Sequence, residues 1–201
     1  MTMIPLLLIG LGNPGSKYAA NRHNVGFMVV DELRAKYGAG AEQRKFGGAL
    51  SEASIGGKKA LLFKPLSFMN HSGLPSVELT RFFKIPLENI IVFHDELDLP
   101  LAKIRVKTGG GHGGHNGLRS LDAHLGQEYK RVRIGIGHPG DKLLVSNYVL
   151  SDFPKEETTH IRALMSDISQ HIDLLLQGDD AGFMNKLAPN EPRNSPTEKQ
   201  E

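Results

Sequence analysis

Short apolar runs alternate with amphipathic segments along this chain, which predicts strands that alternate with helices. The runs Leu6–Gly10 and Ile90–Phe93 are apolar without interruption, as is typical of strands covered on both faces. Four more segments are predicted as strands from their apolar or alternating residues. They are 46–55 and 60–63, which form a hairpin, and 103–107 and 131–136.

Apolar residues recur at helical spacing in five other segments. These predicted helices cover 25–37, 72–83, 118–125, 154–177 and a short stretch that ends near Leu187. Asn24 and Asn116 stand where a helix N-cap is expected. Strands that alternate with helices, together with one hairpin, indicate an α/β fold: a single three-layer domain whose mixed central β-sheet is flanked by helices.

Length and composition limit what the protein can be. A chain of 201 residues with 39% hydrophobic and 23% charged residues is typical of one soluble globular domain. We expect a catalytic domain over residues 1–188 and a disordered tail over 189–201, because the tail holds three prolines and almost no large apolar side chain. No apolar run approaches the ~18 residues of a membrane span, so we expect no membrane contact.

Cysteine content and charge narrow the class further. The chain has no cysteine, which excludes disulfides, thiolate zinc sites and cysteine nucleophiles and fits a cytoplasmic protein. Its first residues lack a basic region and a cleavage site, so we interpret them as a strand and not as a signal peptide. The net charge is +2, but the charges are unevenly distributed along the chain. The middle segment, residues 101–142, is basic, with eight Lys or Arg against three Asp or Glu. Such an excess suggests an anionic partner.

Residues 109–117 read Gly-Gly-Gly-His-Gly-Gly-His-Asn-Gly. A glycine-rich loop loses more conformational entropy on ordering than any other, so holding it still needs a reason. The common interpretation of such a segment is a flexible connector, but a solvated linker would use Ser or Thr instead of histidine and asparagine. We therefore predict a loop that presents backbone amides, imidazoles and a carboxamide at the start of a helix.

Two ionisable residues suggest general-base chemistry. His23 lies at a helix entrance, and Asp95 ends a buried strand, at the edge of the sheet where α/β proteins bind ligands. A neutral histidine within reach of such a carboxylate is a general base with its orienting partner. The sequence alone does not show that the two side chains touch.

Two alternative sites have weaker support. Gly10–Gly15 matches the dinucleotide pattern G-x-G-x-x-G, but Pro14 removes a donor and no helix follows directly, which disfavours a nucleotide cofactor. The chain also lacks the helical H-x-x-x-H and H-E-x-x-H spacings, which disfavours a metal cluster. The candidate ligands of such a cluster are His94, Asp95, Asp98, His112 and His115. We expect neither a cofactor nor a metal.

Several blocks of residues, in one order, cover about residues 6–187. They are Leu8-Ile9-Gly10-Leu11-Gly12-Asn13-Pro14-Gly15 with Tyr18 and Arg22-His23-Asn24-Val25-Gly26, then Phe68-Met69-Asn70-His71-Ser72-Gly73, His94-Asp95-Glu96-Leu97-Asp98-Leu99-Pro100, Gly113-Gly114-His115-Asn116-Gly117-Leu118 and Arg133-Ile134-Gly135-Ile136-Gly137-His138-Pro139-Gly140. Taken together, these blocks resemble the bacterial peptidyl-tRNA hydrolase family, and their number and order make the match far more specific than any one motif.

The resemblance implies hydrolysis of the ester between a peptide and the terminal ribose of tRNA, by a monomer that needs no metal. It assigns His23 as the catalytic base, Asp95 as the carboxylate that holds it, and Asn13 as the residue near the first peptide unit of the substrate. The substrate-binding residues that it implies are Tyr18, Phe68, Asn70, His115 and Asn116. The expected partner is peptidyl-tRNA, through its acceptor stem and CCA end, with no obligate protein partner.

A basic strip beside the glycine-rich loop is predicted to bind tRNA phosphates. Lys103, Arg105 and Lys107 lie on alternate residues of a strand and so share one face. Arg133 stands on a second strand that leads to a glycine-rich turn, and we assign the phosphate contact to Lys107 and Arg133. The alternative is a non-catalytic RNA-binding module, although 6% aromatic residues and no Trp leave little room for the stacking platforms it would need.

Overall fold

A seven-stranded mixed sheet forms the middle layer of the structure, a computed structural model that describes residues 4–188. In chain order its strands are β1 (Leu6–Gly10), β2 (Gln43–Lys45), β3 (Gly48–Ile55), β4 (Lys58–Pro65), β5 (Ile90–Glu96), β6 (Ile104–Thr108) and β7 (Lys130–Gly135). Their order across the sheet is β2-β3-β4-β1-β5-β7-β6. The four central strands run parallel, while β3 and β6 pair antiparallel with β4 and β7.

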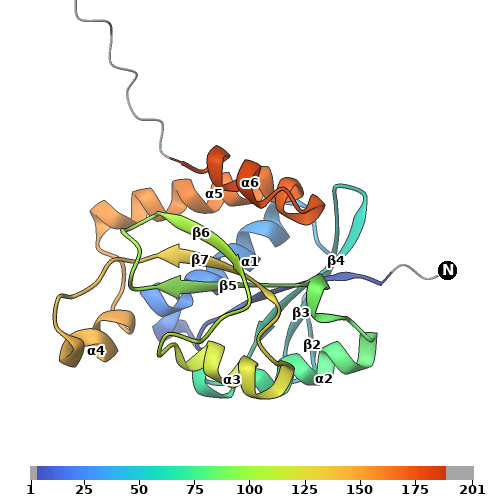
Figure 1. The fold of residues 1–201 in the computed structure, drawn as a ribbon, viewed down its shortest axis with the longest axis horizontal. Coiled ribbons are helices and arrows are strands. Elements are labelled where there is room, and N and C mark those ends of the chain that lie inside the picture. Colours follow the sequence, from blue (N-terminus) through green and yellow to red (C-terminus); the bar gives the residue numbers. More distant parts are fainter. Residues whose placement is uncertain (1–3, 189–201) are drawn as a thin grey trace, which may run out of the picture.

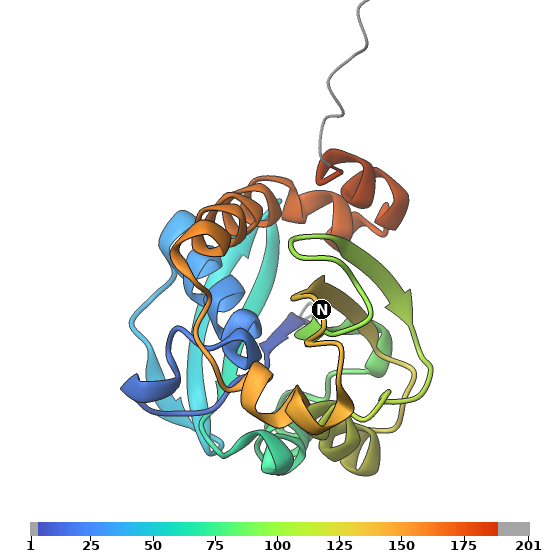
Figure 2. The same cartoon turned by 90° about the vertical axis from the view of Figure 1, so that its left-hand side faces the viewer.

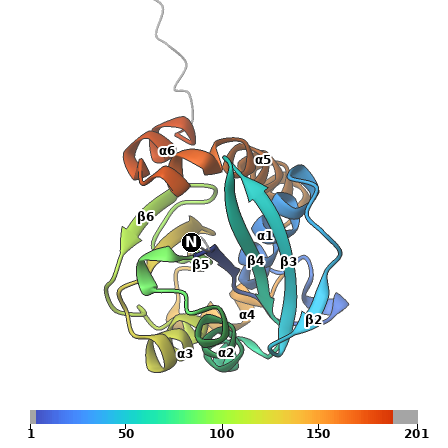
Figure 3. The ribbon, with the colours of Figure 1, turned by 90° about the vertical axis from the view of Figure 1, so that its right-hand side faces the viewer.

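Helices cover both faces of this sheet (Figure 1). They are α1 (Val25–Lys36), α2 (Gly73–Phe83), α3 (Asn116–Leu125), α4 (Val145–Val149), α5 (Lys155–Gln177) and α6 (Asp180–Lys186). Figure 3 shows α1, α5 and α6 on one side of the strands and α2 and α3 on the other, so the predicted three-layer α/β domain is confirmed. The predicted disordered tail, residues 189–201, lies outside the described residues.

The uninterrupted apolar runs of the sequence become the central strands. In β1, Leu8 packs in the core shared with α1 and α5, whereas Leu7 and Ile9 pack in the core shared with α2 and α3. In β5, Phe93 and Val92 divide between the two cores in the same way. Because successive side chains of a strand point to opposite faces, a strand between two helical layers needs apolar residues at every position.

Two short elements were not predicted. Strand β2 has three exposed residues, and α4 has five residues, which is too short for a helical period to show in the sequence. The predicted hairpin, strands and longer helices lie within a few residues of their expected bounds. Within residues 4–188, no helix is long and apolar enough to cross a membrane.

The carboxyl ends of the parallel strands meet at one edge of the sheet, where ligands bind in α/β folds. Helix α4 lies at this edge, at the left of Figure 1 and towards the viewer in Figure 2. The turn after β1 does not enter a helix directly: it continues into short 3-10 turns, and α1 begins only at Val25. A dinucleotide-binding loop passes directly into a helix, so the path of Gly10–Gly15 differs from that of such a loop.

Two glycines allow β1 and α1 to pack with their backbones in contact. A Cβ atom on Gly10 would lie 2.2 Å from the carbonyl oxygen of Gly26. A Cβ atom on Gly26 would lie 2.3 Å from the carbonyl oxygen of Phe93, in β5. Both carbonyl oxygens belong to the backbone, so they cannot move aside as a flexible side chain could. The start of α1 therefore packs directly against the backbone of the central strands.

We predict that Gly26→Ala lowers the free energy of unfolding by about 2 kcal/mol, because the extra methyl group must displace the backbone of a central strand. Urea unfolding followed by circular dichroism measures this change. Gly40→Ala is the matched control, since a Cβ atom there meets nothing closer than 4.0 Å. Equal stability of the two variants would contradict the close packing of β1 and α1.

Candidate active site

A cleft of about 990 Å³ opens at the carboxyl-end edge of the sheet. Eight of the ten residues assigned from the sequence line it: Asn13, Tyr18, His23, Phe68, Asn70, Asp95, His115 and Asn116. Lys107 and Arg133 lie outside its lining. The fold thus gathers residues from four separate parts of the chain, 13–23, 68–70, 95 and 115–116, at one place.

The structure brings His23 and Asp95 into contact. His23 belongs to a 3-10 turn, Arg22–Asn24, and Asp95 lies near the end of β5. The Nδ1 atom of His23 lies 2.9 Å from each carboxylate oxygen of Asp95, and only 10% and 3% of the two side chains are exposed. With the proton of Nδ1 directed at Asp95, the Nε2 atom of His23 is the one left to accept a proton from a reactant.

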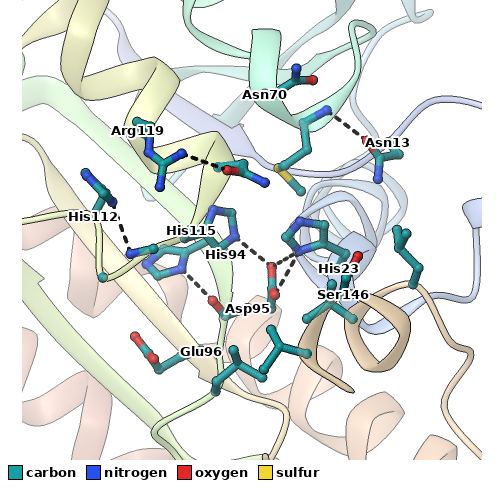
Figure 4. A pocket seen from close by; sticks show the side chains of 18 of the residues that line it. Asn13, His23, Asn70, His94, Asp95, Glu96, His112, His115, Arg119 and Ser146 are labelled. Carbon is teal, nitrogen blue, oxygen red and sulfur yellow. Dashed lines mark hydrogen bonds and ion pairs between the residues drawn. The ribbon is translucent and has the colours of Figure 1, made fainter. Parts of the chain in front are cut away.

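A second imidazole binds the same carboxylate. His115 Nε2 lies 2.8 Å from Asp95 Oδ1, and Figure 4 shows the rings of His23 and His115 on either side of Asp95. His115 Nδ1 accepts hydrogen bonds from the backbone N–H groups of Gly117 and Leu118. The proton of His115 must therefore sit on Nε2, where it is donated to Asp95.

This arrangement corrects one expectation. The N-cap of α3 is His115 and not Asn116, because an imidazole nitrogen satisfies the free N–H groups of the first helical turn. Asn116 is instead the first residue of the helix, and its exposed carboxamide lines the cleft. The role of His115 in substrate binding stays a prediction.

The donor set at Asp95 does not suit a metal. Among residues 4–188, the one group of three ligand-type side chains close enough to share an ion is His23, Asp95 and His115. A metal would need a lone pair on His115 Nε2, which would move the proton to Nδ1. That proton would then face the N–H groups that Nδ1 now accepts. The other sequence candidates, Asp98 and His112, do not join this group.

The environment shifts the pKa values of the site in distinct directions. Burial lowers the pKa of His23, but the charge and the hydrogen bond of Asp95 outweigh it and raise the pKa above 6.5. Burial raises the pKa of Asp95, yet the two imidazoles hold it well below its usual range. Burial and the neighbouring His115 lower the pKa of His94 to about 3, so His94 is neutral near pH 7.

Asn13 is fixed at three atoms. Asn24, which the sequence suggested as a helix cap, makes no cap bond: its side chain accepts from the backbone N–H of Asn13 and donates to its carbonyl, each at 2.9 Å. Asn13 Oδ1 accepts the backbone N–H of Met69 at 2.8 Å. The Nδ2 group of Asn13 is therefore the part of this side chain available to donate a hydrogen bond into the cleft.

Half-buried Tyr18 and the exposed side chains of Phe68, Asn70 and Asn116 form the rim of the cleft. The rings of Tyr18 and Phe68 meet edge to face, 6.4 Å apart, and Phe68 is 56% exposed. Asn70 is exposed beside them, and Asn116 Oδ1 accepts a bond from Arg119 at 3.3 Å. The amide nitrogen of Asn116 is thus left to donate, as in Asn13.

A buried arginine anchors the glycine-rich loop. Arg131 in β7 donates to the carbonyl oxygen of Gly111 at 2.9 Å and forms an ion pair with Asp122 of α3 at 3.0 Å. Its guanidinium also lies 4.7 Å from the centre of the Tyr129 ring. These contacts explain how a segment with so many glycines keeps one conformation beside the cleft.

The two predicted phosphate-binding residues differ in their surroundings. Lys107 in β6 is exposed, whereas Arg133 in β7 donates to the Glu96 carboxylate at 2.9 Å. Arg105 lies directly opposite Arg133 in the sheet, so their side chains share a face. Lys107 is therefore the freer of the two cations.

Sequence reasoning missed several residues of the site. Asn24 and Met69 hold Asn13, Arg119 and Lys142 bring cations to the cleft, and α4 forms one of its walls. Only Asn24 and Met69 carried a signal, because they lie inside the matched blocks. The contacts of the others depend on how distant segments pack.

Fold and site together define an α/β protein with a buried histidine–aspartate pair in the cleft at the carboxyl-end edge of its sheet. Comparison with known proteins names the family: the family model described as "Peptidyl-tRNA hydrolase" matches residues 7–196. Proteins named "Peptidyl-tRNA hydrolase" from Methylorubrum extorquens (strain PA1) and Afipia carboxidovorans are 55% and 51% identical over 181 residues, which is 90% of this chain and 86% and 90% of theirs. This chain belongs to the peptidyl-tRNA hydrolase family.

A solved structure supports the same conclusion. The crystal structure of peptidyl-tRNA hydrolase from Acinetobacter baumannii at 1.00 Å resolution matches with a TM-score of 0.86 and 42% identity, over 93% of this chain and 96% of that chain. The family resemblance inferred from the sequence blocks is thereby confirmed.

We predict that Asp95→Asn lowers the pKa of His23 below 6.5, because burial then acts without the opposing carboxylate. In the unchanged protein, the pKa should lie above 6.5. Titration of the His23 ring carbon and proton signals by NMR measures both values. Asp98→Asn is the control, since Asp98 lines the cleft outside the His23–Asp95–His115 group and its replacement should leave the pKa of His23 unchanged.

Proposed function

We propose that this protein hydrolyses the ester that joins a peptide, or an N-blocked aminoacyl group, to the 3′-terminal ribose of tRNA. The observation that carries the proposal is the His23–Asp95 pair in the cleft of a chain that belongs to this family. Hydrolysis of such esters frees tRNA from prematurely released peptidyl-tRNA.

His23 acts as the general base of the reaction. Its Nε2 atom takes a proton from water, which attacks the ester carbonyl carbon, while Asp95 orients the ring and stabilises the imidazolium that forms. An ester has a good leaving group, so an activated water suffices without a nucleophilic side chain. General-base catalysis supplies roughly 10²–10⁴-fold, and positioning supplies much of the remainder.

Neutral donors stabilise the negative charge of the tetrahedral intermediate. The Nδ2 groups of Asn13 and Asn116 are side-chain amide donors at the cleft. Because the Oδ1 atom of Asn13 is occupied by Met69, we assign Asn13 as a donor to a carbonyl oxygen of the first peptide unit. Tyr18, Phe68, Asn70 and His115 contact the rest of the substrate.

The tRNA body lies along the face that carries Lys107 and Arg133, with its acceptor stem leading the CCA end into the cleft. Contacts to phosphates supply affinity and register with little sequence information. A non-catalytic RNA-binding module, the alternative function, would leave the buried His23–Asp95 pair without a role. The monomeric state, the lack of an obligate protein partner and the cytoplasmic location stay predictions.

We predict that His23→Ala lowers kcat at least a hundredfold for N-acetyl-aminoacyl-tRNA, because the base is lost, while tRNA affinity stays within about threefold. Asp95→Asn should cost less than His23→Ala but should still lower kcat by orders of magnitude, since the base loses both its orientation and its charge partner. His160→Ala, an exposed histidine on α5, is the control. If His23→Ala keeps a tenth of the original rate, His23 is not the base.

We predict that Lys107→Ala raises KM for N-acetyl-aminoacyl-tRNA and reduces the slope of log affinity against log salt by about one unit, with kcat nearly unchanged. Arg133→Ala should act in the same direction but less, because Glu96 already pairs with Arg133. Lys59→Ala, an exposed lysine on the hairpin, is the control. A loss of kcat with an unaltered salt slope would place the tRNA on another face.

A further inference from the structure

Arg22, the residue before the catalytic histidine, is buried and has no part in the mechanism above. Only 7% of its side chain is exposed, and its guanidinium forms an ion pair with Glu157, in the first turn of α5. The guanidinium carbon lies 4.4 Å from the centre of the Tyr148 ring and 5.0 Å from that of Phe153. Arginine makes such cation–π contacts more often than lysine, and only its planar guanidinium can also stack flat on a ring.

The residues around Arg22 all belong to one stretch, residues 145–157, which we call the α4–α5 segment. Its backbone follows the His23 turn closely: the N–H of Arg22 donates to the carbonyl of Ser151 at 3.0 Å, and Asn21 Nδ2 donates to Asp152 at 2.6 Å. Figure 2 shows this orange segment beside the blue segment that leads into α1. The α4–α5 segment and the catalytic turn are thus bound together over several residues.

The other side of the same segment is a wall of the cleft. Val145, Ser146, Val149 and Leu150 line it, and Figure 4 shows the Ser146 side chain close to His23. A five-residue helix has too few internal hydrogen bonds to hold its own shape, so the position of α4 depends on its contacts. Two of these contacts come from Tyr148: its hydroxyl donates to the carbonyl of Ile136 at 2.5 Å, and its ring faces Arg22.

We propose that Arg22 is a positioning residue that fixes α4 at its distance from His23 and so sets the width of the substrate cleft. The inference rests on the proposed hydrolysis of peptidyl-tRNA. His23 itself is oriented by Asp95, a contact that does not involve Arg22. Loss of Arg22 therefore releases the wall and weakens substrate binding, while the base keeps its chemistry.

The test compares Arg22→Gln, Arg22→Lys and Glu157→Gln with the unchanged protein. We expect Arg22→Gln to raise KM for N-acetyl-aminoacyl-tRNA about tenfold, with kcat within about twofold and an unshifted pH profile of kcat/KM. Arg22→Lys keeps the charge but not the planar stacking and should give an intermediate KM. Glu157→Gln should raise KM less than Arg22→Gln, because the stacking on Tyr148 and Phe153 stays.

Hydrogen exchange of the substrate-free protein tests the wall directly. In Arg22→Gln, the amides of residues 145–150 should exchange at least about tenfold faster, and those of β5 should be unchanged. If Arg22→Gln does not fold, Glu157→Gln and Tyr148→Leu carry the same two measurements. Unchanged KM together with unchanged exchange would overturn the proposal, and so would a loss of kcat with a shifted pH profile, which would mean that Arg22 acts on His23.

The two proposals fail in different ways. A protein that does not hydrolyse N-acetyl-aminoacyl-tRNA contradicts the proposed function, whatever the substitution at Arg22 does. The exchange of residues 145–150 needs no substrate, so it decides whether Arg22 holds α4 even then. If the protein hydrolyses N-acetyl-aminoacyl-tRNA but the amides of residues 145–150 exchange at the same rate in Arg22→Gln, only the positioning role of Arg22 is contradicted.

Discussion

The carboxylate of Asp95, shared by two imidazole N–H groups, is the interaction on which the site depends. A buried carboxylate is costly unless hydrogen bonds stabilise its charge, and here His23 and His115 provide them. The same bonds join three elements: the turn before α1, the strand β5, and the start of α3. Because His115 also caps α3, the glycine-rich loop that precedes it is held at the same point. The carboxylate of Asp95 thus fixes the positions of both His23 and the glycine-rich loop.

Bonds from side chains to backbone groups hold the remaining loops. Asn24 binds both backbone groups of Asn13, Asn13 binds the N–H of Met69, and Arg131 binds the carbonyl of Gly111. Each bond fixes a segment that would otherwise lose conformational entropy when substrate binds. The conformational entropy of these loops is therefore lost when the protein folds and not when substrate binds. As a result, the donors at the cleft need little rearrangement during the proposed reaction.

Much of the fold could be predicted from the sequence because the signals are local. Uninterrupted apolar runs predict the central strands, and local patterns also predict the hairpin and the long amphipathic helix. The blocks that resemble the peptidyl-tRNA hydrolase family contain His23, Asp95 and Asn13, so the resemblance indicates these three residues. What the sequence could not show depends on distant contacts. His115 takes the place of Asn116 as a cap because Asp95 fixes its ring, and Arg22 meets Glu157 across 135 positions. Hydrophobic periodicity and motif spacing do not predict contacts between residues so far apart in the sequence. Helix α4 is too short for a helical repeat of apolar residues to be detected.

The electrostatics of the site balance the strength of the base against its availability. A raised pKa makes His23 a stronger base but leaves less of it unprotonated near neutral pH. The neighbouring imidazoles could shift this balance if they were charged, since a cation beside Asp95 would offset the carboxylate. Burial keeps His94 neutral, so it adds no cation beside Asp95. The negative charge of Asp95 therefore acts on His23, and in the proposed mechanism it does so most strongly when His23 has taken a proton from water and has become an imidazolium.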